Sequence, residues 1–286
     1  MKNVRLIALD MDGTLLLSDH HTVPARNIEA IRRAASLGIR VAINTGRMLE
    51  DASDFIRRLD LPCLIIAANG ARASEGPVPE CRMLYRCNIE AQDAQRALDI
   101  LIPSGMMING FEDGVVHTAG GEPGWKYHLV HRGLIEARYG EKTLREAADR
   151  GVMKIFAVAD GFAGEAADPR VDALRAQLER ELPQLQISSS APGNIEITSP
   201  EAGKGQTLGR VAAHYGLSRE QVMAVGDAGN DLDMLRYAPH SVAMGNASED
   251  VKRICRYVTA DNDACGVAQI IERVIDAATE GACEHG

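Results

Sequence analysis

Short apolar runs alternate with longer segments of helical periodicity along the first third of the chain. The apolar runs of strand length are residues 4–9, 39–43 and 64–68. One helical segment begins at Pro24, has apolar residues at spacings of three and four, and ends at Gly38, while the other covers residues 51–59. This β-α-β-α-β order predicts a parallel sheet with helices on both faces.

The same alternation returns near the C-terminus. The elements expected there are helices at 208–215, 231–235 and 266–278 and strands at 222–225 and 241–244. These elements have the lengths and the order that would complete the sheet begun in the first third of the chain.

The middle of the chain has a different texture. The elements expected there are helices at 90–101 and 171–182, strands at 152–158, 184–188 and 194–198, and a hairpin at 106–117. The hairpin turn is indicated by the pair Asp113-Gly114. We therefore predict an α/β protein in which a Rossmann-like, doubly wound and mostly parallel sheet, residues 1–81 and 191–286, carries a smaller inserted α+β domain, residues 82–190.

Composition is typical of a globular protein and argues against several other classes. The length of 286 residues suits about two folded domains. With 45% hydrophobic and 25% charged residues, the composition is that of a folded chain and not of a disordered one. The net charge of −9 opposes nonspecific attraction to nucleic acid or to an anionic membrane, so we expect neither partner. The oligomeric state is left open.

The sequence also favours a cytoplasmic location. No apolar run approaches the roughly 18 residues of a membrane-spanning helix, and the run from Leu6 to Leu9 is too short for a signal-peptide core. The six cysteines lie apart without C-x-x-C spacing, which is typical of reduced thiols.

Three polar clusters each follow directly after a predicted strand, where ligands bind in parallel α/β sheets. They are Asp10-Met11-Asp12-Gly13-Thr14, Asn44-Thr45-Gly46-Arg47 and Gly226-Asp227-Ala228-Gly229-Asn230-Asp231. Asp10 and Asp12 point to one side of an extended chain, and two such carboxylates resist joint ionisation unless a cation compensates them or one of them holds a proton. The hydroxyl and amides of the second cluster suit a phosphate. The oxygens of the third cluster suit Mg²⁺.

Each cluster also has an ordinary structural explanation, as an acidic turn or as a helix cap. Lys204, between two glycines before a helix, is a further candidate for phosphate contact as a point charge. A P-loop is excluded because Gly205 follows the lysine and Thr198 stands where its first glycine would fall. No G-x-G-x-x-G follows a strand, so a dinucleotide-binding site loses its main support.

In this order, Asp-x-Asp-Gly-Thr, Thr-Gly-Arg, Lys and Gly-Asp-x-x-Asn-Asp resemble the four signature motifs of the haloacid dehalogenase (HAD) superfamily of phosphohydrolases. The inserted segment lies between the second and third motifs, as the type-II cap domain does in the Cof-like branch. Asn69-Gly70-Ala71 and the segment Val242 to Ala247 are similar to that branch too. The resemblance implies a HAD-type phosphoric monoester hydrolase whose inserted domain is a substrate-specificity cap.

The resemblance also implies a role for each motif. Asp10 would be the nucleophile that forms an aspartyl phosphate, and Asp12 the general acid and base. A Mg²⁺ ion would be held by Asp10, Asp12 (through its backbone carbonyl), Asp227 and Asp231. The phosphate oxygens would be bound by Met11, Thr14, Thr45, Gly46, Lys204 and Asn230.

The substrate is implied only as a class, a small phosphorylated metabolite such as a sugar phosphate, a cofactor phosphate or a nucleotide. The candidates for contact with it are Arg47, Asn69 and Lys154. His20 lies in a loop that either touches substrate or is simply solvated, and His128 with His131 is either a metal pair or, more plainly, a surface pair.

Two other functions use the same motifs. A phosphotransferase or phosphomutase acting on a sugar phosphate needs all four, so the sequence separates it poorly from a phosphatase. A non-catalytic binding protein on the same scaffold is opposed by the presence together of Asp10, Asp12, Lys204 and Asp227.

Overall fold

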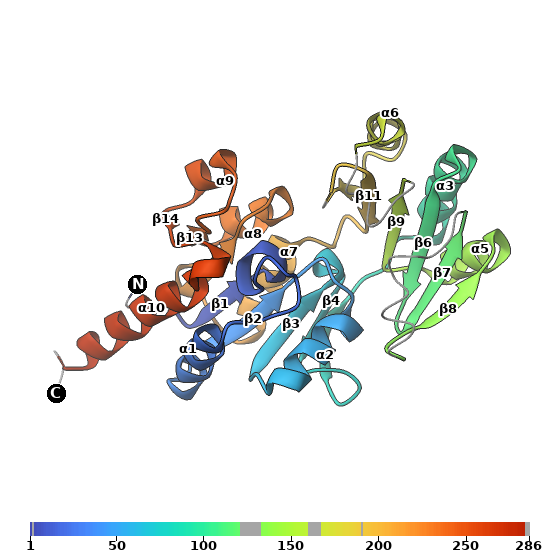
Figure 1. Ribbon diagram of the computed structural model, residues 1–286. Helices are drawn as coiled ribbons and strands as arrows, with labels where there is room; N and C mark the ends of the chain where they lie inside the picture. Colours follow the sequence, from blue (N-terminus) through green and yellow to red (C-terminus); the bar gives the residue numbers. More distant parts are fainter. Residues whose placement is uncertain (2, 121–132, 160–166, 190, 284–286) are drawn as a thin grey trace. The chain divides into compact units, whose positions relative to one another are not determined.

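The computed structural model describes residues 1, 3–120, 133–159, 167–189 and 191–283. The chain divides into two compact units, which we call the core unit (Met1–Tyr85 with Gly203–Gly286) and the inserted unit (Arg86–Ala202), both drawn in Figure 1. Both boundaries lie further along the chain than the sequence indicated. The reason is strand pairing: Arg82–Arg86 joins the sheet of the core unit, and Asn194–Thr198 joins the sheet of the inserted unit.

An eight-stranded sheet forms the centre of the core unit. Its strands, in spatial order, are β14 (Tyr257–Val258), β13 (His240–Ala243), β12 (Val222–Gly226), β1 (Leu6–Leu9), β2 (Arg40–Asn44), β3 (Cys63–Ala67), β4 (Arg72–Glu75) and β5 (Arg82–Arg86). The pairings from β14 to β3 are parallel, and β4 runs antiparallel to β3. The chain winds outward from β1 in both directions, so the predicted doubly wound, mostly parallel sheet is confirmed.

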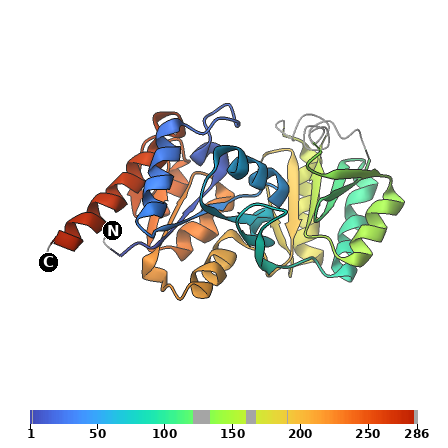
Figure 2. The same cartoon turned by 90° about the horizontal axis from the view of Figure 1, so that it is seen from below.

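Helices cover both faces of this sheet. They are α1 (Ala25–Ser36), α2 (Leu49–Leu59), α7 (Lys204–His214), α8 (Leu232–Tyr237), α9 (Glu249–Ile254) and α10 (Gly266–Cys283). Figure 2 shows α1 and α10, which contact each other, on one face and the contacting pair α7 and α8 on the other. Because both faces are covered, β1, β3 and β12 are buried throughout, which explains their continuous apolar sequences.

The inserted unit has a six-stranded sheet with helices packed on one face. Its strands, in spatial order, are β10 (Gln186–Ser188), β11 (Asn194–Thr198), β9 (Lys154–Val158), β6 (Met107–Glu112), β7 (Val115–Ala119) and β8 (Glu136–Tyr139), and its helices are α3 (Ala91–Leu101), α5 (Glu141–Arg150) and α6 (Pro169–Glu181). Leu98, Leu144 and Leu178, one from each helix, share an apolar cluster with Ile155 and Ile195. The predicted α+β architecture is confirmed, and so is the hairpin, as the antiparallel pair β6 and β7.

His128 and His131 lie outside the described residues. Within the described part of the chain, no helix combines the length and the apolar character needed to cross a membrane.

Candidate active site

The first polar cluster forms a sharp turn at the end of β1. Gly13 in this turn has a φ of +75°, and a Cβ atom there would lie 2.4 Å from Oδ2 of Asp227. Glycine is therefore needed both for the backbone conformation and for the close approach. The backbone N–H of Asp10 donates to the carbonyl of Val225 at 3.1 Å, which joins the turn to the end of β12. The first and third clusters are thus neighbours in space, as the sequence predicted.

Lys204 is a buried ammonium that connects two carboxylates of this turn region. Its Nζ donates to Oδ1 of Asp10 at 2.5 Å and to Oδ1 of Asp231 at 2.7 Å, and its side chain is 1% exposed. Burial disfavours the charge on Lys204, but the two carboxylates outweigh burial and raise its pKa. The other oxygen of Asp231 accepts the backbone N–H groups of Asp227 and Ala228 at 3.0 and 3.1 Å, which fixes that carboxylate in place.

The donor set of this cluster fits a divalent metal ion. Asp10, Asp227 and Asp231 each offer an oxygen, and these atoms lie within 4.8 Å of one another. Burial and repulsion from Asp231 raise the pKa of Asp10 well above its usual range despite Lys204. Burial and Asp231 also raise the pKa of Asp227 to about 6, although the Thr14 hydroxyl donates to its Oδ1 at 2.7 Å. One ammonium therefore leaves negative charge uncompensated among hard oxygen ligands, which is the environment that divalent cations bind.

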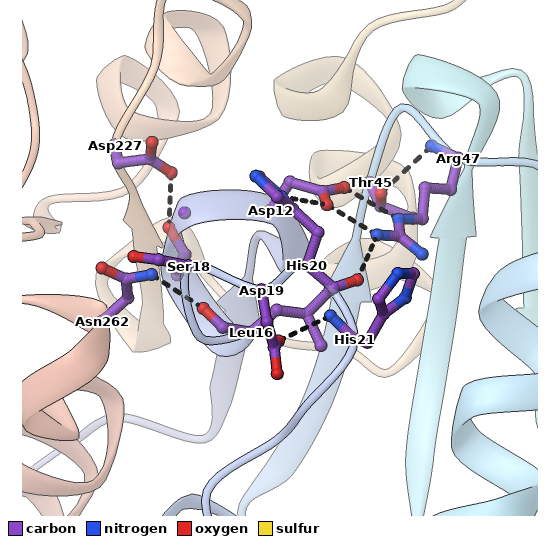
Figure 3. Close-up of polar contacts among 12 residues, drawn as sticks. Asp12, Leu16, Ser18, Asp19, His20, His21, Thr45, Arg47, Asp227 and Asn262 are labelled. Atoms are coloured by element: carbon purple, nitrogen blue, oxygen red, sulfur yellow. Dashed lines mark hydrogen bonds and ion pairs between the residues drawn. The ribbon is translucent and has the colours of Figure 1, made fainter. Parts of the chain in front are cut away.

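Asp12 faces a different cation, Arg47, as Figure 3 shows. The Arg47 Nε donates to Oδ2 of Asp12 at 2.8 Å and Nη2 donates to Oδ1 at 2.6 Å. Burial acts to raise the pKa of Asp12, but the hydrogen bonds and charge of Arg47, with a smaller contribution from His20, hold it below its usual value. The side chain of Asp12 remains 41% exposed.

The second cluster links the ends of β2 and β3. The backbone N–H of Thr45 donates to the carbonyl of Ile66 at 2.8 Å, and the buried Thr45 hydroxyl accepts the N–H of Arg47 at 3.1 Å. A Cβ atom on Gly46 would lie 2.8 Å from Oδ1 of Asn69, so the glycine allows Asn69 to approach. The amide of Asn44 donates to the backbone carbonyl of Lys204 at 3.1 Å and so ties the second cluster to the start of α7.

Comparison with known proteins identifies the family to which the chain belongs. A family model described as haloacid dehalogenase-like hydrolase matches residues 7–271. The chain belongs to that family. Phosphatase YwpJ of Bacillus subtilis is 32% identical over 95% of this chain and 100% of its own length. The 5-amino-6-(5-phospho-D-ribitylamino)uracil phosphatase YwtE of the same organism is 31% identical over 95% of this chain and 98% of its own length.

A solved structure gives the same result for the fold. A haloacid dehalogenase-like hydrolase from B. subtilis superposes with a TM-score of 0.81 at 29% identity, covering 95% of this chain and 100% of that one. The HAD superfamily resemblance and the HAD-type phosphoric monoester hydrolase predicted from the motifs are confirmed.

The structure of this HAD-like hydrolase brings most of the predicted site residues to one edge of the core sheet. The side chains that share direct contacts there are those of Asp10, Asp12, Thr14, Arg47, Lys204, Asp227 and Asp231. Met11 is buried in the first turn, and Asn230 is half-buried in the third. Lys154 lies in β9 of the inserted unit, where its Nζ is 2.6 Å from Oε2 of Glu196.

Several residues outside the predicted set of site residues contact the site in this HAD-like hydrolase, among them His20, for which the sequence left substrate contact and a solvated loop both open. His20 Nδ1 lies 3.3 Å from Oδ1 of Asp12, and Asp51 accepts from Arg47. Asn246 donates to the carbonyl of Gly13 at 2.8 Å. The spacing of Asp51, four residues after Arg47 where a helix begins, is a signal that could have been found. Asn246 lies in the segment Val242 to Ala247 that resembles the family, but its spacing gives no signal of this contact because more than two hundred residues separate it from the turn.

A second asparagine supports the same loop. The amide of Asn262 donates to the carbonyl of Leu16 at 2.9 Å, as Figure 3 shows, and its backbone N–H donates to Asn246. The C-terminal part of the core unit therefore holds the turn after β1 in place through side-chain amides.

Proposed function

We propose that the chain is a Mg²⁺-dependent phosphatase that hydrolyses a small phosphorylated metabolite through an aspartyl phosphate on Asp10. One observation carries the proposal: the Asp10 carboxylate, at the end of β1, is paired with buried Lys204 and lies among the carboxylates of Asp227 and Asp231. The name of relative YwtE, a phosphatase of a ribitylaminouracil phosphate, supports a small metabolite as the substrate class.

In the first chemical step, a carboxylate oxygen of Asp10 attacks phosphorus and the bond from phosphorus to the leaving oxygen breaks. Lys204 contacts Oδ1, so we assign the attack to Oδ2. Asp12 in its protonated form gives that proton to the leaving oxygen. In the second step, Asp12 takes a proton from water, the water oxygen bonds to phosphorus, and the aspartyl phosphate breaks to regenerate the Asp10 carboxylate.

The carboxylates of Asp10, Asp227 and Asp231, with the backbone carbonyl of Asp12, would hold Mg²⁺. When bound, Mg²⁺ would offset the repulsion between Asp10 and an anionic phosphate and stabilise charge that develops during transfer. The Thr14 hydroxyl donates to Asp227, so we propose that Thr14 orients that carboxylate. We also keep Thr14 as a residue that would lie beside the bound phosphate.

The phosphate oxygens would be bound by groups at the same edge of the sheet. We assign this role to the Thr45 hydroxyl, the Lys204 ammonium, the Asn230 amide and the backbone amides of Met11 and Gly46. Donors fixed by the fold before substrate arrives can each contribute about 10²-fold to rate, because they need no reorganisation during the reaction.

The inserted unit would select the leaving group. Ile155 and Ile195 point into its helix-covered apolar cluster, so the alternating neighbours Lys154 and Glu196 lie on the opposite face of the sheet. A buried cation and carboxylate there could recognise polar groups of a metabolite. We assign Lys154 and, in the core unit, Asn69 to substrate contact.

Release of inorganic phosphate from a panel of phosphorylated metabolites tests the proposal. The assay compares wild type with Asp10→Asn, each with Mg²⁺ and with EDTA, and uses Asp60→Asn at the exposed end of α2 as a matched control. We expect release that requires both Mg²⁺ and Asp10 and is unchanged in the control. Release by Asp10→Asn, or indifference to EDTA, would contradict the mechanism. Transfer of phosphate to a second sugar without free phosphate would favour a phosphotransferase.

A further inference from the structure

We propose that Asp51 is a positioning residue for the general acid Asp12, and that it acts through Arg47. The proposal rests on the proposed phosphatase function and deepens it, because it concerns the proton transfer to the leaving group. Neither Asp51 nor its contact with Arg47 belongs to the four motifs.

The contact between Arg47 and Asp12 is bidentate, a fork of two hydrogen bonds between one guanidinium and one carboxylate. The bonds from Nε to Oδ2 and from Nη2 to Oδ1, at 2.8 and 2.6 Å, run side by side, so one guanidinium plane fixes both oxygens of the carboxylate. Two parallel bonds define the orientation of a carboxyl group as well as its position. Asp12 is 41% exposed, so solvent around it gives little packing to hold it otherwise.

Arg47 is itself held on its other sides. Its Nη1 donates to Oδ2 of Asp51 at 3.2 Å, and its Nη2 also donates to the backbone carbonyl of His20 at 3.1 Å. The ring of Phe55, one turn further along α2, lies 5.0 Å from the guanidinium carbon. Asp51 is 8% exposed in side chain, in the first turn of α2. The first turn of α2 thus carries the carboxylate that orients the arginine.

This arrangement has a kinetic consequence. A general acid transfers its proton along a short, defined direction, and small misplacements lower the rate steeply. When Asp51 is replaced by Asn, the guanidinium keeps its charge but loses its ionic partner at Nη1, and the neutral amide oxygen that remains is a weaker acceptor, so Asp12 becomes less well oriented. The loss of rate should therefore appear with substrates whose leaving group needs a proton. It should be absent with substrates whose leaving group departs without one.

The same helix supplies a matched control. Asp54 and Arg58 also form an i,i+4 pair, with Arg58 Nε 2.8 Å from Oδ2 of Asp54. Arg58 also stacks on Phe55, at 4.7 Å, but its side chain is 51% exposed. Asp54→Asn therefore removes a carboxylate charge from the same helix. That carboxylate also pairs with an arginine that stacks on Phe55, but this arginine does not contact Asp12 in the part of the chain that the structure describes.

The experiment measures kcat/KM for two phosphomonoesters in the presence of Mg²⁺. This ratio reports the steps up to departure of the leaving group, so hydrolysis of the aspartyl phosphate does not enter. One substrate is p-nitrophenyl phosphate, whose leaving group departs without protonation. The other is glycerol 1-phosphate, or the best alkyl phosphate of the panel, whose alkoxide must be protonated.

We expect Asp51→Asn to lower kcat/KM for the alkyl phosphate by about 10- to 100-fold, the range found for residues that orient a metal ligand from behind. For p-nitrophenyl phosphate we expect less than about a 3-fold loss, because general acid catalysis contributes little there. Asp54→Asn should change neither value. Equal losses on both substrates, or a loss in Asp54→Asn as large as in Asp51→Asn, would overturn the proposal.

A second variant keeps the test independent of folding defects. Arg47→Lys retains a charge beside Asp12 but replaces the fork by a point donor. It should show the same dependence on the leaving group, and adding Asp51→Asn to it should cost less than Asp51→Asn alone. Additive losses would mean that Asp51 does not act through Arg47. If wild type released no phosphate from any substrate, the proposed function would fail first, and this inference with it.

Discussion

Two cations flank the turn after β1, and they treat its two aspartates differently. Lys204 contacts Asp10 from inside the core unit, and its side chain is 1% exposed. Arg47 contacts Asp12 closer to solvent, at what we call the rim of the site, and its side chain is 18% exposed. Lysine supplies a compact point charge that two carboxylates share. Arginine supplies a fork that fixes the plane of one carboxylate.

The difference appears in the acidities of the two aspartates, which are only two residues apart. The pKa of Asp10 is raised by burial and by its acidic neighbours, while the pKa of Asp12 is lowered by Arg47. Asp10, the side chain that must be ionised to attack, is thus the one whose negative charge and acidic surroundings Lys204 alone does not compensate. The buried cluster therefore fits a further cation, whereas the Arg47 contact fits the proposed orientation of Asp12.

The largest effect we expect concerns the nucleophile. Asp10→Asn keeps the shape of the side chain but removes its nucleophilic oxygen, so turnover should fall by about 10⁴-fold or more. Asp12→Asn should lower turnover of alkyl phosphates by about 10²- to 10⁴-fold. Phosphate-release rates of purified variants measure both. Near-normal turnover by Asp10→Asn would contradict the assignment of the nucleophile.

Loss of each cation should affect stability to a different degree. Lys204→Met leaves Asp10 and Asp231 buried without their ammonium and should lower the free energy of unfolding by about 3–5 kcal/mol. Arg47→Met removes a partly exposed pair and should lower it by about 1 kcal/mol. Denaturant titrations in EDTA give both values. If the two losses were equal, the contrast between a buried and a rim cation would be wrong.

The pH dependence of folding stability should report the ionisation of Asp227. Its pKa, about 6 in the folded metal-free protein, lies above the ordinary value of 3.8, so the folded state binds a proton more tightly than the unfolded state. Its contribution to stability is therefore fully present below about pH 4 and is lost as pH rises through about 6. In EDTA, Asp227→Asn should melt above wild type at neutral pH, and the gap should close toward pH 4.

Added Mg²⁺ provides the control for this pH effect. Wild type should gain melting temperature at neutral pH because the metal binds the folded state, whereas Asp227→Asn should gain little. A gap in EDTA that did not change with pH would contradict the assignment of the raised pKa to Asp227.

Salt should produce the smallest effect. Raising NaCl from about 0.05 M to about 0.5 M shortens the screening length severalfold and weakens exposed ion pairs more than buried ones. The stability loss in Arg47→Met should shrink by about half a kcal/mol or less. The loss in Lys204→Met should stay constant in the same titration, and a comparable decrease there would count against its burial.

Local patterns were sufficient for much of the fold. The apolar runs and helical stripes placed β1, β2, β3, β12 and β13 within two residues, because buried parallel strands leave continuous apolar sequence. They failed for β5, whose sequence Arg-Met-Leu-Tyr-Arg is half-buried, and for β8, whose only non-exposed position is Ala137. Both are edge strands, where a face open to solvent removes the signal.

Sequence alone determined which chemistry the chain carries. Asp10, Asp12 and Asp227 could be found because they follow strands of a parallel sheet, whose carboxyl ends lie at one edge. Lys204 could be found because two glycines flank it before a helix, and the resemblance to the family implied the role of each residue. Only the tertiary structure decided which cation serves which carboxylate, because those pairings join residues up to about two hundred positions apart and depend on side-chain direction. Arg47 illustrates this: its contact with substrate stays a prediction, whereas only the fold shows that its guanidinium contacts Asp12 and Asp51.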